Sequence, residues 1–195
     1  MIDLRYLKLL TFLAMSQALA GRRYISSKLG MGEGVVRGLI ELGRGLGHIS
    51  VNRAGAKITD NGIRYLAEVI SLCRLKPLAY TNKFAEKLCG RVCVAFSLGI
   101  KIDNIVKFRD SVVRRGSCGI IIAQLRDNNI YIPLAEMRLE DLDPEMAGSI
   151  KGLLSREDFL IISCGDNFGQ ALAPLEVVCE MMIEPGRSDE VRHPI

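Results

Sequence analysis

Tryptophan is absent from the 195 residues, histidine occurs only at His48 and His193, and no two cysteines form a C-x-x-C pair. A zinc site would therefore need an all-cysteine ligand set without the usual close pairs. Apart from His193 near its end, the second half of the chain also lacks a histidine that could activate a serine or cysteine nucleophile, and no close pair of carboxylates marks a cleft there. We expect no metal, no cofactor and no enzymatic activity.

Long apolar runs are absent too. No stretch approaches the roughly 18 to 20 apolar residues that cross a bilayer, and Asp3, Arg5 and Lys8 interrupt the N-terminal run. A signal peptide is one reading of this run, because basic residues precede an apolar stretch with a small-x-small end at 18–20. The three- and four-residue spacing of its leucines favours instead an amphipathic first helix, and we expect a cytoplasmic protein without membrane contact.

The cysteines are spread through apolar runs, which predicts that most are buried thiols. A disulfide between Cys89 and Cys93 is the alternative, should that segment be irregular. The six positions are Cys73, Cys89, Cys93, Cys118, Cys164 and Cys179.

Charge divides the chain into two unlike halves. Residues 1–90 carry 14 Lys and Arg against 6 Asp and Glu, whereas residues 91–195 carry 12 against 16. A basic module attracts polyanions such as DNA, because every neutralised phosphate releases counterions. We expect the acidic second half to serve another purpose.

Hydrophobic periodicity predicts a winged helix-turn-helix over residues 1–76. Two of its helices are separated by the short turn Gly30-Met31-Gly32, and two alternating stretches form the wing. The expected elements are helices at 4–19, 24–29 and 33–43, a hairpin of 47–52 and 55–60, and a helix at 60–76 that Thr59 or Asp60 caps.

After a connector at 77–90, residues 91–183 predict a small β-α-β-β-α-β-α domain. If its first two strands are parallel, their crossover is right-handed. Residues 184–195 lack a regular apolar stripe and are expected to be a flexible tail. The predicted fold class is therefore α/β with two domains, at 1–76 and 91–183. The expected elements are strands at 91–98, 118–126, 130–134 and 158–164, and helices at 103–116, 144–154 and 169–183. We expect Asp103 and Asp143 to cap the first two of these helices, and Pro133 to place its strand at an edge of the sheet.

Seven glycines between residues 28 and 49 raise the question of a phosphate-binding loop. Such a loop follows a buried strand and has fixed glycine spacing or a Gly-Lys-Ser/Thr end, and this stretch has neither. In a winged helix, Gly30 and Gly32 permit the turn and Gly47 begins the wing.

Basic and hydroxyl side chains around the third helix are the candidate contacts to double-stranded DNA. Gly34 and Gly38 inside that helix cost about 0.5–1 kcal/mol each relative to alanine and offer no side chain to a base, which predicts a weak base reader. Dimerisation or protein contact is the alternative use of the domain. The candidate DNA-binding residues are Ser26, Ser27, Lys28, Arg37, Arg44, Arg53 and Lys57.

A small-molecule effector could bind where strands of the second domain end. The alternative for the charged members of this set is a surface ion pair of Arg109, Asp110 and Arg114. The candidate effector residues are Ser97, Arg109, Asp110, Asp166 and Asn167, and Gly99 is expected to line the same crevice.

The run "ISSKLGMGEGVVRGLIELGRGLGHISVNRAGAKITDNG" resembles the winged-helix domain of archaeal transcriptional regulators, and "FRDSVVRRGSCGIIIAQLRDNNIYIP" is similar to the domain of unknown function that accompanies it. The resemblance covers residues 20–183, although Val35 stands where the family usually has threonine. It implies a homodimeric, DNA-binding transcriptional regulator whose second domain senses an effector or mediates assembly. We also expect the helix at 60–76 to contribute to the dimer contact. The alternative is a ligand-binding or protein-interaction module that does not bind DNA.

Overall fold

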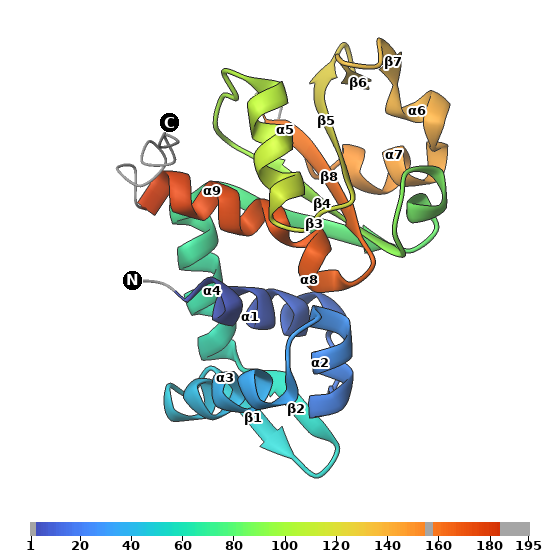
Figure 1. Cartoon of the computed structure of the whole chain (residues 1–195). Coiled ribbons are helices and arrows are strands. Elements are labelled where there is room, and N and C mark those ends of the chain that lie inside the picture. The colour runs from blue at the N-terminus through green and yellow to red at the C-terminus, as the bar shows by residue number, and fades with distance from the viewer. Residues whose placement is uncertain (1–2, 155–157, 184–195) are drawn as a thin grey trace, which may run out of the picture.

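The computed structural model describes residues 3–154 and 158–183. Its N-terminal part lies at the lower end of the molecule in Figure 1 and consists of four helices and a two-stranded hairpin. Thr59 caps the fourth helix as predicted, because its Oγ1 accepts a hydrogen bond from the Gly62 N–H at 3.1 Å. The elements are α1 (Leu4–Ser16), α2 (Arg22–Leu29), α3 (Glu33–Gly45), β1 (Ile49–Asn52), β2 (Gly55–Ile58) and α4 (Asp60–Cys73).

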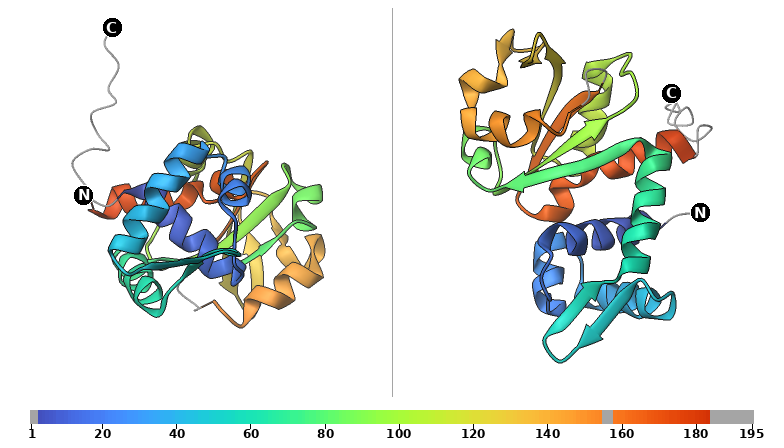
Figure 2. Two further views of the ribbon diagram at one scale, coloured as in Figure 1. Left: turned by 90° about the horizontal axis from the view of Figure 1, so that it is seen from below. Right: turned by 180° about the vertical axis from the view of Figure 1, so that it is seen from behind.

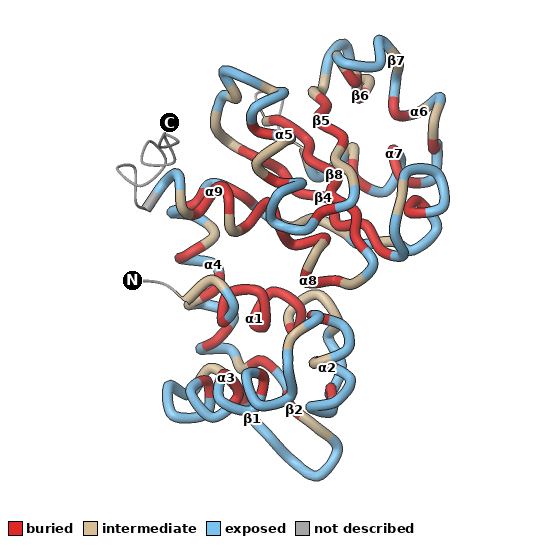
Figure 3. Tube along the Cα trace, viewed as in Figure 1, coloured by how far each residue is buried: buried red, intermediate tan, exposed pale blue. Residues whose placement is uncertain are grey.

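Helix α1 is buried on all sides, which corrects the expectation of an amphipathic helix. Every residue from Tyr6 to Leu13 is buried, including the polar Lys8 and Thr11. Figure 3 shows α1 as a buried element in the middle of the molecule, with α2 and α3 below it and α8 and α9 above it, and it also contacts α4. Partners on both sides of a helix hide the face that periodicity assigns to solvent.

The rest of the chain builds a six-stranded sheet in the order β3-β4-β8-β5-β6-β7, and every neighbouring pair is antiparallel. Strand β8 lies between β4 and β5, so these two strands run parallel to each other without pairing. The right-handed crossover expected between them stays a prediction. The strands are β3 (Leu75–Thr81), β4 (Val92–Leu98), β5 (Gly119–Arg126), β6 (Asn129–Ile132), β7 (Met137–Arg138) and β8 (Phe159–Gly165).

Helices cover both faces of the sheet. One face and the N-terminal helices share a single hydrophobic cluster, to which α5, α8 and α9 contribute. A second cluster lies on the other face beneath a 3-10 helix, α6 and α7. These elements are η1 (Phe84–Lys87), α5 (Ile105–Arg114), α6 (Leu139–Leu142), α7 (Pro144–Lys151), α8 (Phe168–Ala171) and α9 (Ala173–Ile183).

Residues 77–90, which we expected to be a connector, contribute to the sheet. They contain most of β3, which forms the outer strand of the sheet, and the 3-10 helix η1. The polar and proline-containing pattern is that of an edge strand, since Pro77 lacks an N–H and the register shifts between Pro77 and Ala79. The division into domains at 76 and 90 stays a prediction.

Several local details also differ from expectation. The cap of α5 is Asn104 rather than Asp103, because the Asn104 side chain accepts a hydrogen bond from the Lys107 N–H at 2.8 Å. Pro133 lies beyond β6, and β6 is not an edge strand because β7 pairs with it. The expected helix at 169–183 is divided into α8 and α9. Asp143 caps α7 as predicted.

All six cysteines form disulfides, which overturns the prediction of buried thiols and that of a Cys89–Cys93 pair. The bonds are Cys73–Cys179, Cys89–Cys118 and Cys93–Cys164, with partners 106, 29 and 71 residues apart. Cys93 and Cys164 are directly opposite in the ladder of β4 and β8. The strand order, which spacing along the chain does not reveal, brings these partners together.

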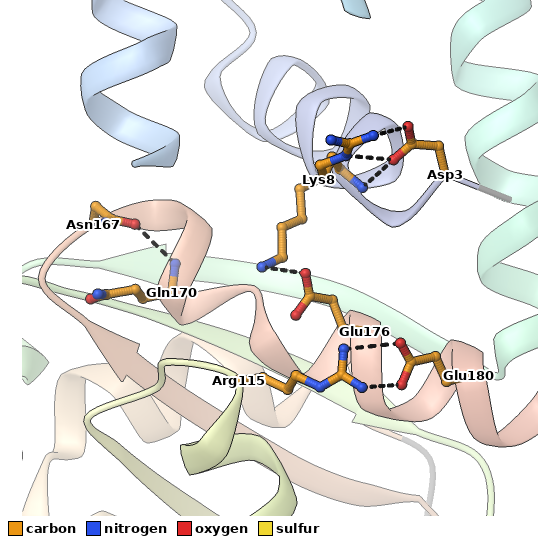
Figure 4. A network of polar contacts seen from close by, with 8 residues as sticks. Asp3, Lys8, Arg115, Asn167, Gln170, Glu176 and Glu180 are labelled. Atoms are coloured by element: carbon orange, nitrogen blue, oxygen red, sulfur yellow. Dashed lines mark hydrogen bonds and ion pairs between the residues drawn. The ribbon is translucent and has the colours of Figure 1, made fainter. Parts of the chain in front are cut away.

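A buried ion pair joins the N-terminal helices to the sheet. The Lys8 Nζ lies 2.9 Å from the Glu176 Oε1, so α1 contacts α9 (Figure 4). The Cys73–Cys179 disulfide joins α4 to α9, and a Cβ at Gly169 would lie 2.0 Å from the Leu29 carbonyl oxygen. The two parts are thus held together by charge, by a covalent bond and by close backbone approach.

Within residues 3–154 and 158–183, no helix is long and apolar enough to cross a membrane. The expected tail at 184–195 lies outside the described residues.

Removal of one partner of the buried ion pair should destabilise the protein strongly. Glu176→Gln leaves the Lys8 ammonium, which is 7% exposed, without its counter-charge, and we expect a loss of about 3 kcal/mol in the free energy of unfolding. The double variant Lys8→Met, Glu176→Leu should stay within about 1 kcal/mol of the natural chain. Guanidinium denaturation with the disulfides intact measures both. A single variant as stable as the natural chain would contradict the role given to this pair.

Candidate nucleic-acid interface

Exposed basic side chains gather on α2, α3, the hairpin and the start of α4. Residues 20–64 contain eight Lys and Arg against three Asp and Glu, and all eight basic side chains are exposed. In the view from below, α2, α3 and the hairpin lie at the near end of the molecule (Figure 2, left). This end therefore carries a net positive charge and is not covered by the sheet.

Three of the predicted contacts are the exposed residues Arg37, Arg53 and Lys57. Their side chains make no hydrogen bond, ion pair or ring contact with the described residues. Arg44 differs, because its guanidinium lies 3.0 Å from the Glu41 carboxylate one turn away. The Lys28 Nζ lies 5.4 Å from the centre of the Tyr24 ring. Lys28 and Arg44 thus already have partners within the chain.

The two predicted serines lie at the end of α2. The Ser26 hydroxyl donates to the Met31 carbonyl, which closes the turn between α2 and α3, whereas Ser27 is exposed. Gly30 in that turn has a φ of +63°, a conformation that favours glycine. Gly32 instead has a φ of −60°, so the turn requires only one of the two glycines.

The outward face of α3 is formed mainly by glycine. The buried face consists of Val36, Leu39, Ile40 and Gly43, whereas Leu42 is exposed. At about 100° per residue, Gly34, Gly38 and Gly45 share the opposite side with Glu41. A Cβ at any of these three glycines would have no neighbour within 4 Å. No backbone strain or internal packing among the described residues requires glycine there.

An aromatic cluster fixes the junction between α3 and the hairpin. The rings of His48 and Tyr65 stack with centres 4.6 Å apart, and the Tyr6 Oη lies 3.0 Å from the His48 Nδ1. Burial, and then the nearby Tyr65, raises the pKa of Tyr6 to about 12, so the phenol keeps its proton at neutral pH. The cluster joins α1 and α4 to the junction and so orients α3 relative to the hairpin.

The hairpin is also held along β2 and at its turn. Ala20 and Ala56 exchange two backbone hydrogen bonds, at 3.0 Å and 2.9 Å, which attach β2 to the segment between α1 and α2. The Asn52 side chain accepts hydrogen bonds from the N–H groups of Ala54 and Gly55. Arg53 and Lys57 are thus carried by a preorganised loop.

The predicted effector residues do not form one site. Ser97 near the end of β4 pairs with Leu160 at the start of β8, so it lies at the opposite end of the strands from Asp166 and Asn167. The prediction failed because antiparallel strands place successive carboxyl ends at opposite edges of the sheet. Asn167 instead caps α8 by accepting a hydrogen bond from the Gln170 N–H at 3.0 Å (Figure 4).

The charged residues of α5 confirm in part the alternative prediction of a surface ion pair. The Arg109 and Asp110 side chains form an exposed ion pair at 3.0 Å. Arg114 donates to the backbone carbonyl of Asp110 and not to its carboxylate. Within the part of the chain that the structure describes, no group of three or more His, Cys, Asp or Glu side chains could hold a metal ion.

Comparisons with known proteins find one family model that is similar to part of the chain. Residues 90–177 match a family described as a domain of unknown function (DUF4443). A solved structure of a hypothetical protein from Pyrococcus horikoshii OT3 is similar, with a TM-score of 0.68, 22% sequence identity, and coverage of 93% of this chain and 94% of that chain. No curated protein matches. The similarity extends over both halves of the fold, and the description of that protein names no activity.

The glycine face of α3 leads to a stability prediction. Gly34→Ala and Gly38→Ala should each raise the free energy of unfolding by about 0.5–1 kcal/mol, because alanine restricts the unfolded chain and meets nothing in the folded one. The matched control is Gly43→Ala, whose Cβ would lie 2.6 Å from the Ile49 Cδ1 and which should destabilise. Urea denaturation compares the three variants. A loss of stability in the first two would show that these glycines have an internal role.

Proposed function

We propose that α2, α3 and the β1–β2 hairpin act as a winged helix-turn-helix that binds double-stranded DNA, and that the protein is a transcriptional regulator. The observation that carries this proposal is the basic charge at this end of the molecule. Within the described residues, six exposed cations there have no anionic partner: Arg22, Lys28, Arg37, Arg53, Lys57 and Arg64.

Phosphate contacts supply most of the affinity in this proposal. Arg37 on α3 and Arg53 and Lys57 on the hairpin contact the sugar-phosphate backbone, since unpaired cations release counterions when they neutralise phosphates. The glycines on the outward face of α3 let the helix backbone approach the floor of the major groove but provide few hydrogen bonds to bases. Sequence preference is correspondingly weak.

A second copy of the chain completes the proposal. Winged-helix regulators read two half-sites on one side of the duplex, about 34 Å apart, so a homodimer must present both α3 helices in the same direction. Part of α4 remains available for such a contact, since Ile63 and Leu72 are exposed.

The affinity for DNA should depend steeply on salt and on the predicted basic residues. We expect the full chain to bind a mixed-sequence duplex more weakly at about 200 mM than at about 50 mM salt, and each lost phosphate contact to reduce the slope of log K against log salt by about 0.9. The double variant Arg37→Ala, Arg53→Ala should therefore lose about 2 from that slope. Fluorescence anisotropy measures it.

The control for this titration is Lys107→Ala, which removes an exposed, unpaired cation from α5. It should leave both affinity and salt slope unchanged. Absence of binding at low salt, or equal losses in the control and in the double variant, would contradict the proposed function.

A protein-interaction module is the second candidate, and the other edge of α3 favours it. Val35, Leu42 and Leu46 are 40%, 47% and 52% exposed, next to the glycines that would allow another helix to approach closely. Leu42→Glu should then dissociate a complex of two copies in sedimentation experiments. A complex that withstands both Leu42→Glu and raised salt would argue against contact through this edge.

A further inference from the structure

A mostly apolar groove of about 950 Å³ lies between α1, α4 and β3. In the view from behind, β3 crosses above α1, and α4 stands at one end of both (Figure 2, right). The groove separates the N-terminal helices from the edge of the sheet. Its main apolar lining residues are Met15, Ile63, Leu66, Ile70, Pro77 and Leu78.

The edge of β3 is poorly suited to accept a further strand. Pro77 has no N–H to donate, the register shifts between Pro77 and Ala79, and the neighbouring Lys76 is exposed. Proline, bulges and lysine on an outer strand are the features that prevent edge-to-edge pairing. An occupant of this groove therefore contacts side chains and does not extend the sheet, which favours a small molecule over a peptide strand.

Positive charge lies at one side of the groove. Arg74 and Lys76 both line it, are exposed and have no ion pair within the described residues. The carboxylate of Asp158 also lines the groove, and it accepts a hydrogen bond from the Ser97 Oγ at 2.5 Å. Two unpaired cations beside one engaged carboxylate favour an anionic group on the occupant.

Thr11 of α1 lies beneath the lining of the groove. It is completely buried, and its Oγ1 has no hydrogen-bond partner among the described residues. A buried hydroxyl without a partner is unfavourable, so a ligand that displaces the side chains covering Thr11 and places an oxygen atom there would remove a cost that the free protein carries.

We propose that this groove binds an amphipathic carboxylate. The aliphatic part lies against the apolar side chains of α4 and β3, the carboxylate faces Arg74 and Lys76, and a hydroxyl on the chain pairs with Thr11. The groove adjoins α1 and α4, the helices whose Tyr6 and Tyr65 hold the junction of α3 and the hairpin. An effect of the ligand on DNA affinity rests on the proposed function, whereas the binding itself does not.

Calorimetric titration of the full chain with decanoate, without DNA, tests the site. Ala67→Phe places a ring on the exposed side of α4 that lines the groove, and it should weaken binding by about tenfold or more. Its matched control, Glu68→Phe, alters the next exposed residue of α4, which does not line the groove, and should bind as the natural chain does. Equal affinities for the two variants would overturn the proposal.

The charge of the ligand is tested with two further probes and one variant. Arg74→Asn suits the left-handed backbone at this position, φ +53°, and should weaken decanoate several-fold while leaving decanol unchanged. Decylammonium, with the same chain and the opposite charge, should bind more weakly than decanoate. Equal binding of the two ions would overturn the assignment of a carboxylate.

The role of Thr11 has its own readout. Among monohydroxydecanoates, at least one isomer should bind more tightly than decanoate to the natural chain, and Thr11→Val should abolish that preference. A preference that survives in Thr11→Val would overturn the role given to the hydroxyl.

DNA titrations with and without decanoate separate the two proposals. A chain that binds decanoate in the groove but not DNA contradicts the proposed function alone. A chain that binds DNA but not decanoate contradicts the groove alone.

Discussion

The burial of α1 is the constraint on which the rest of the structure depends. This helix carries Tyr6 toward the junction of α3 and the hairpin, Phe12 against Phe168 of α8, and Lys8 against Glu176 of α9. In an apolar layer many helix registers bury similar area, but only one places the Lys8 ammonium beside a carboxylate. A charge buried without a partner is costly enough to exclude the others. The position of the basic end relative to the sheet is thus set by α1.

Local sequence patterns were sufficient to predict most helices and strands. The order of the strands in the sheet depends on contacts between distant segments, which local patterns do not reveal. Thr59 and Asp143 cap helices as predicted, because a cap depends on a side chain and an N–H only three residues away. The strand order was not predictable in this way. The insertion of β8 between β4 and β5 joins segments far apart in the chain, and an apolar run such as 158–164 fits a parallel or an antiparallel strand equally well.

The same distinction explains what could be known of the sites. The exposure of Arg37, Arg53 and Lys57 was predictable because it follows from the periodicity of a helix or hairpin. Ser97 and Asn167 were grouped wrongly because that required the strand directions, and the disulfides were missed because they required the strand order. The groove had a weak signal in Ile63 and Ala67, which widen the apolar stripe of α4 beyond what the core covers. Nothing in the sequence marked Thr11 as an unpartnered hydroxyl.

The two edges of α3 have different chemistry, and this bears on both proposed uses of the helix. Arg37 and Arg44 lie on one side of the glycine face, whereas Val35 and Leu42 lie on the other. Contact between the basic edge and phosphate keeps much of its water and weakens as salt rises. Contact between the apolar edge and another helix expels water and is nearly insensitive to salt. Both contacts also use the glycines between these edges, so a helix packed over them would keep DNA away from the same α3, and the two uses of α3 compete within one copy of the chain.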